Sequence, residues 1–185
     1  LAEVAAAHDR TPAQLRAALL SDRTLTVDRG GRLFYRDPAP TGDVPSRSEE
    51  RAWVAARQVA PLSQTFSLHS NPGADLTIFL DVDGATVADT YWNVDNGLAD
   101  GDHPAWDPAG DGPTFSDAEL EIVQAVYAAV AEDFAPFDVD VTTEDPGFAG
   151  IDRSGAADGV YGTRALISPS DAALNAICGG GCGGV

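Results

Sequence analysis

The feature that most constrains the fold is a strand, a long helix and two further strands in succession. Residues 76–80 form a short apolar run, which is typical of a buried strand. Apolar side chains in residues 120–134 fall on one helical face, and a helix-capping sequence precedes them at 116–119. Apolar and polar residues alternate over 137–142, and 163–167 offers another strand. Because parallel strands need a long crossover, this order predicts an α/β layer with at least two parallel neighbours.

The composition excludes some classes of function. The 185 residues carry 29 acidic and 11 basic side chains, a formal net charge of −18, and every basic residue is Arg. A surface this acidic repels phosphates, so we expect no nucleic-acid partner. No apolar run approaches the ~20 residues that a membrane span needs, so we expect no membrane partner either.

Charge and linker residues divide the chain. Residues 1–36 carry six Arg and four acidic residues, and a stretch rich in Pro follows at 37–46. A Thr-Pro helix start at Thr11 and strand-like residues around a Gly-containing turn predict two short helices and a hairpin. We therefore expect a helical and hairpin leader at 1–45, a linker at 46–74 and a main domain at 75–185.

Two carboxylates, Asp81 and Asp83, follow the first strand of the main domain. Ligands of open α/β sheets bind at the carboxyl ends of strands, and residues two apart in an extended chain point to the same side. Asp81 and Asp83 could therefore share a cation such as Mg²⁺ or Ca²⁺, or they could organise a turn. Residues 79–84 also resemble the nucleophile motif of haloacid-dehalogenase-type phosphatases, in which the first Asp attacks phosphorus. The chain has no Lys, which that family uses to steady the phosphoryl group.

Other candidate ligands form weaker patterns. The loop at 93–116 is rich in Asp, but no stretch has the EF-hand register, so we interpret it as solvated and keep calcium as a candidate cofactor. Its oxygen-bearing residues are Asp95, Asn96, Asp100, Asp102, Asp107 and Asp111. His8, His69 and His103 are scattered, and we expect each of them at the surface.

Cys178 and Cys182 are the only cysteines. Their even number and the three glycines between them favour a small disulfide loop, with Cα atoms below ~7 Å apart. A disulfide indicates an oxidising compartment.

Several segments together share the pattern of one family. They are residues 61–73, 80–84, 90–93, 114–119, 130–146, 161–164 and 178–185, and 130–146 is the most specific of them. Together they resemble the front half of a secreted bacterial zinc metallopeptidase of the metzincin type. The resemblance implies a metzincin-like N-terminal subdomain of the α/β class, with a twisted, mostly parallel sheet and a long backing helix. This subdomain would be incomplete and preceded by a small helical pro-region.

The resemblance also assigns roles to the elements. It implies strands at 76–82, 137–143 and 163–168, a backing helix at 117–134, and an antiparallel edge strand that pairs with substrate. That substrate-edge strand would begin at Gly183, Gly184 and Val185. The zinc-binding helix, His-Glu-x-x-His-x-x-Gly-x-x-His, would follow Val185, so the resemblance implies no catalytic residue and no metal ligand within this chain.

What the resemblance implies for function is an inactive fragment of a larger enzyme. The full-length protein would be a secreted endopeptidase with zinc as cofactor and a protein or peptide as substrate. Two alternatives stay open: a phosphatase that uses Asp81 and Asp83, and a non-catalytic secreted acidic binding module.

Overall fold

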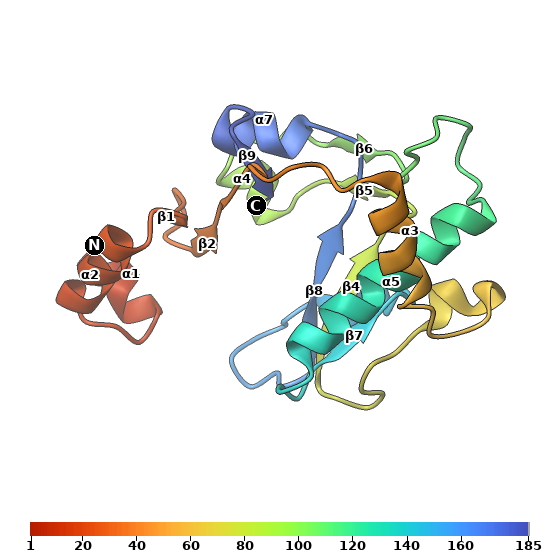
Figure 1. Ribbon diagram of the computed structural model, residues 1–185. Coiled ribbons are helices and arrows are strands. Elements are labelled where there is room, and N and C mark those ends of the chain that lie inside the picture. Colours follow the sequence, from red (N-terminus) through yellow and green to blue (C-terminus); the bar gives the residue numbers. More distant parts are fainter. Residues whose placement is uncertain (185) are drawn as a thin grey trace. The chain divides into compact units, whose positions relative to one another are not determined.

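The computed structural model describes residues 1–184 and is mixed α/β, with several helices and a small parallel sheet (Figure 1). The chain divides into two compact units. One unit combines Leu1–Asp43, Thr86–Asp102 and the segment from Ser170, and the other combines Val44–Ala85 and His103–Pro169.

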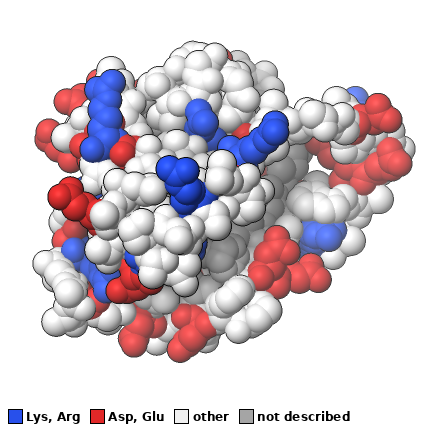
Figure 2. All heavy atoms as spheres, turned by 90° about the vertical axis from the view of Figure 1, so that its left-hand side faces the viewer, with Lys and Arg blue, Asp and Glu red and all other residues white. Residues whose placement is uncertain are grey.

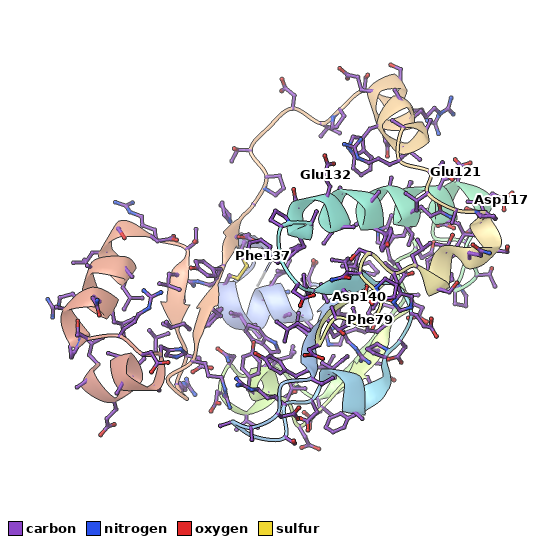
Figure 3. All side chains as sticks on the ribbon, turned by 90° about the horizontal axis from the view of Figure 1, so that it is seen from below. Phe79, Asp117, Glu121, Glu132, Phe137 and Asp140 are labelled. Carbon is purple, nitrogen blue, oxygen red and sulfur yellow. A yellow bond between two sulfur atoms is a disulfide. The ribbon has the colours of Figure 1, made fainter. Side chains whose placement is uncertain are left out.

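A three-stranded parallel sheet forms the centre of the second unit. Its strands are β4 (Leu76–Asp81), β7 (Asp140–Thr142) and β8 (Tyr161–Leu166), in the order β7-β4-β8. Helix α5 (Asp117–Phe134) lies between β4 and β7 in the sequence, and the short helix α6 (Gly147–Ile151) follows β7. Figure 3 shows Phe79 of β4 and Asp140 of β7 on one side of α5. The predicted succession of strand, long helix and two strands is confirmed.

The two ends of α5 follow from local sequence. Ser116 caps the helix: its hydroxyl accepts a bond from the Glu119 N–H, and the Glu119 carboxylate accepts one from the Ser116 N–H, which is the predicted capping box. Pro136 lies two residues after Phe134, the last helical residue, and has no N–H to donate. One face of α5 packs on the sheet, and the core there contains Leu68, Leu80, Tyr127 and Val141. Burial of each such side chain contributes about 1.5–3 kcal/mol.

Part of the predicted linker, residues 46–74, is packed on α5. The helix α3 (Arg47–Ala55) and the 3₁₀ helix η1 (Leu62–Ser67) both contact α5. Gln124 of α5 is completely buried and binds the segment between them. Its Oε1 accepts bonds from the N–H groups of Val59 and Ala60, each at 3.1 Å, and its Nε2 donates to Thr65 Oγ1 at 3.0 Å. Long-range bonds of this kind leave no local pattern, which is why composition alone suggested a linker.

The first unit contains the predicted leader. Helices α1 (Ala2–Ala7) and α2 (Pro12–Ser21) precede a hairpin of β1 (Leu25–Val27) and β2 (Leu33–Tyr35). The capping box expected at the start of α2 is present. Two short helices and a hairpin are therefore confirmed in this part of the chain.

The leader packs against a later segment of the same unit. Arg32 forms an ion pair with Asp95 and lies over the ring of Tyr91. Phe34 meets Trp92 edge-on, with ring centroids 5.3 Å apart. These aromatic partners belong to α4 (Tyr91–Val94). The unit boundary after Asp43 lies close to the predicted one at 45, but the leader shares its unit with residues distant in sequence.

The chain passes between the two units in a strand pair. β5 (Ala85–Val87) pairs with β6 (Gly101–His103), and two of the four unit boundaries, 85/86 and 102/103, fall within these strands. On the face drawn in Figure 2, acidic side chains form several separate groups and Arg side chains lie among them.

The predicted substrate-edge strand pairs differently from expectation. β9 (Cys182–Gly184) pairs antiparallel with β3 (Asp37–Pro38) of the leader, and it is not a strand of the β7-β4-β8 sheet. A Cβ at Gly183 would lie 3.0 Å from the Pro38 carbonyl oxygen, so glycine permits the close approach. Because Gly183 and Gly184 have no apolar side chains, they give this strand nothing to bury on the sheet. Val185, the third residue of the predicted edge, lies outside the described residues.

Candidate functional site

The strongest candidate lies at the carboxyl end of β4, where Asp81 is 2% exposed. Arg164 of the neighbouring strand β8 places its Nε 3.3 Å from Asp81 Oδ2. The Arg164 guanidinium also lies over the Phe79 ring, 5.5 Å from its centroid. Asp81 Oδ1 is buried and has no hydrogen-bond partner within residues 1–184. Two parallel strands thus bring a buried carboxylate and a cation to the edge where open α/β sheets bind ligands.

The environment of Asp81 favours its neutral form. Burial first, and the Asp83 carboxyl second, raise the pKa of Asp81 to about 6, against the opposing effect of Arg164. Asp83 itself is exposed. A carboxyl group that titrates near neutrality can act as an acid or base, but it can equally be a buried structural group. Because Asp81 is almost entirely enclosed, it is better placed to hold the strand end than to attack a substrate.

The turn after β4 explains why Asp81 is covered. Gly84 has a φ of +88°, and a Cβ there would lie 2.6 Å from the Ala105 nitrogen. Trp106 donates its N–H to the Val82 carbonyl at 2.8 Å, so residues 103–106 cross the end of the strand. His103 begins this segment and is buried, 7% exposed. The expectation that His103 lies at the surface is therefore wrong, because the close crossing at Gly84 encloses it.

His69 lies between two carboxylates near the other end of the sheet. Its Nδ1 is 2.6 Å from Asp140 Oδ2, and its Nε2 is 3.1 Å from Glu144 Oε2. Asp140 Oδ1 accepts the N–H groups of Ser70 and Asn71, at 2.9 and 3.0 Å. Partial burial alone would lower the pKa of His69, but the bonds to Asp140 and Glu144 outweigh it and the pKa is raised. This cluster fastens the segment before β4 to β7.

We expect His69→Gln to reduce the pH dependence of stability above pH ~6.5. A raised pKa means that the folded state holds the His69 proton more tightly than the unfolded state. The stability that His69 contributes is therefore fully present below its pKa in the unfolded state. It is lost as pH rises through its pKa in the folded state. Urea unfolding between about pH 6 and pH 8.5 measures it, with the exposed Glu132→Gln as control. An unchanged pH slope in the His69 variant would contradict this account.

The two cysteines form a disulfide in the first unit. Cys178, the last residue of α7 (Ala172–Cys178), is bonded to Cys182, and their Cα atoms are 6.0 Å apart. Gly179 adopts a φ of +63° directly after the helix, which lets the chain reverse. The loop fixes the start of β9.

The oxygen-rich residues of the loop at 93–116 divide between the two units. In the first unit, Asp95 pairs with Arg32, Asn96 donates to Asp28, and Asp102 accepts from Thr86. In the second unit, Asp107 and Asp111 come together with Glu119 of α5. His8, also in the first unit, is half-buried, with its Nε2 3.0 Å from the Gly31 carbonyl oxygen.

Several residues of these clusters carried no signal of their role in the sequence. Arg164, Gln124 and Asp140 each contact residues more than 60 positions away. The register of the two parallel strands could have indicated that Arg164 lies near Asp81, because Arg164 of β8 pairs with Phe79 of β4. The sequence indicates Glu119 only as part of a helix cap. No local sequence pattern indicates that it lies near Asp107.

Comparison of the chain with protein-family models, with curated proteins and with solved structures finds no match. Within residues 1–184, no helix has both the length and the apolar character needed to cross a membrane.

Proposed function

We propose that this chain supplies the sheet scaffold and one wall of the cleft of a secreted zinc endopeptidase of the metzincin type. The observation that carries the proposal is the parallel sheet β7-β4-β8 with α5 in the connection from β4 to β7. These elements overlap the ranges 76–82, 117–134, 137–143 and 163–168 that the resemblance implies, which supports the proposal, whereas the implied edge strand does not join this sheet. The zinc-binding helix is expected after residue 185, where three His would hold the metal and a Glu would take the proton of the attacking water.

Two features of the first unit support a secreted precursor. The Cys178–Cys182 disulfide suits an oxidising compartment. β3 of the leader pairs antiparallel with β9, the strand proposed to bind substrate, so the leader occupies that strand as a pro-region would. Removal of the leader would then be needed before a peptide could pair there.

The phosphatase alternative is less well supported. A nucleophilic carboxylate has to reach phosphorus, whereas Asp81 is buried and held by Arg164. No specific observation favours the third interpretation, an acidic binding module.

Expression of the complete reading frame tests the proposal. We expect cleavage of casein or a quenched peptide, its loss with 1,10-phenanthroline and its return with Zn²⁺, whereas residues 1–185 alone should be inactive. Chelator-sensitive cleavage by residues 1–185 alone would contradict the placement of the ligands. Turnover of p-nitrophenyl phosphate with Mg²⁺ that is lost in Asp81→Asn would favour the phosphatase. Binding of proteins without cleavage by the complete protein would favour the binding module.

A further inference from the structure

We propose that Asp107, Asp111 and Glu119 form a Ca²⁺ site beside the N-terminal end of α5. One carboxylate oxygen from each residue lies within 4.8 Å of the other two. A single ion among these oxygens would lie at most about 2.8 Å from each of them, close to the roughly 2.3–2.6 Å of Ca²⁺–oxygen bonds. The three residues all belong to the second unit, and the inference does not depend on the proposed function.

Glu119 distinguishes this group from an ordinary acidic loop. The residue is 5% exposed, and its Oε2 accepts bonds from the N–H and the hydroxyl of Ser116, both at 2.8 Å. Its Oε1 is buried and has no hydrogen-bond partner in the described part of the chain. A buried carboxylate oxygen without a donor is unfavourable, and a bound cation would satisfy it.

Asp107 is held in place by the backbone of the loop. Its Oδ2 accepts the Gly112 N–H at 3.0 Å, and its Oδ1 accepts the N–H groups of Gly110 and Asp111 at 2.6 and 3.2 Å. These bonds, first of all the one from Gly112, hold the pKa of Asp107 below its ordinary value, so it is a carboxylate at neutral pH.

No protein cation within residues 1–184 forms an ion pair with this group of Asp107, Asp111 and Glu119. Asp111 itself is exposed. Three neighbouring carboxylates repel one another, and a divalent cation would offset that repulsion.

The donor set selects calcium among the common metals. All three ligands are carboxylates, whereas zinc sites in proteins mostly use Cys and His. Mg²⁺ demands a compact octahedron and keeps its waters, whereas Ca²⁺ accepts irregular oxygen sites on flexible loops. Gly110 and Gly112, at φ of +71° and +119°, give the loop the required backbone freedom. The spacing differs from that of an EF-hand, so the sequence pattern did not indicate this site.

Titration of the 185-residue chain with Ca²⁺ tests the inference. After treatment with EDTA, the chain is titrated by calorimetry in about 0.15 M NaCl, which screens non-specific binding to its acidic surface. Glu119→Gln removes the charge but keeps a residue that completes capping boxes, so α5 should still form. Asp111→Asn changes an exposed side chain, and Asp117→Asn is the control, since Asp117 is an exposed acid in the same turn of α5 (Figure 3).

We expect one saturable Ca²⁺ site per chain, at least roughly tenfold weaker in Glu119→Gln and in Asp111→Asn, and changed less than about twofold in Asp117→Asn. Circular dichroism confirms that each variant is folded. The inference is overturned if the wild-type chain shows no saturable binding below about 10 mM Ca²⁺, if both cluster variants bind as tightly as wild type, or if Mg²⁺ binds more tightly than Ca²⁺.

Discussion

Gln124→Ala should lower the free energy of unfolding by about 2–4 kcal/mol. Gln124 is completely buried, and its amide binds the N–H groups of Val59 and Ala60 and the hydroxyl of Thr65. The change leaves a cavity in α5's buried face and removes the partners of these groups at once. The segment between α3 and η1 should consequently detach more easily.

Urea unfolding and amide hydrogen exchange over residues 56–65 measure this effect. Glu121→Ala is a matched control on the same helix, because its side chain is exposed and only its backbone carbonyl accepts a bond from Gln58. We expect a change below about 0.5 kcal/mol in the control. Equal stabilities of the two variants would contradict the stabilising role assigned to the Gln124 side chain.

Asp81→Asn should raise the free energy of unfolding at pH 8 by about 1–3 kcal/mol. Its raised pKa, about 6 against 3.8, means that the folded state disfavours the charged carboxylate. The stability that protonated Asp81 contributes is therefore fully present below pH ~3.8, its ordinary pKa. It is lost as pH rises through about 6, its pKa in the folded state. Asn keeps the shape and an acceptor for Arg164 without that charge.

Unfolding of wild type and variant at several values between about pH 4 and pH 8 measures the difference. Wild type should lose stability relative to the variant over this range. Asp75→Asn is the control, since Asp75 is an exposed acid just before the same strand. A variant less stable than wild type at pH 8 would mean that the ion pair with Arg164 outweighs burial, and that the sign of the argument is wrong.

Local patterns predicted the elements of this chain well. The capping boxes at Ser116 and Thr11 fixed the starts of α5 and α2, because a cap depends on residues three positions apart. The apolar run at 76–80 and the alternation at 137–142 located β4 and β7, although β7 is shorter than predicted and contains only Asp140–Thr142. Such signals are local, and hence readable from one sequence.

Contacts between distant residues were not predictable in the same way. Nothing near Cys182 indicated that β9 would pair with Asp37–Pro38, about 145 residues earlier. No pattern around His103 in the sequence indicates the crossing at Gly84 that buries it. The acidic group of Asp107, Asp111 and Glu119 joins a loop to a helix cap, and only the folded chain brings these carboxylates together.

The zinc content of the purified protein tests the central claim most directly. The complete reading frame and residues 1–185 are each produced, dialysed and measured for metal by mass spectrometry. The proposed function predicts about one tightly bound Zn²⁺ per complete chain, held by the three His of the downstream helix, and no stoichiometric zinc in residues 1–185. A complete protein that binds no zinc, or residues 1–185 that bind a full equivalent, would contradict it.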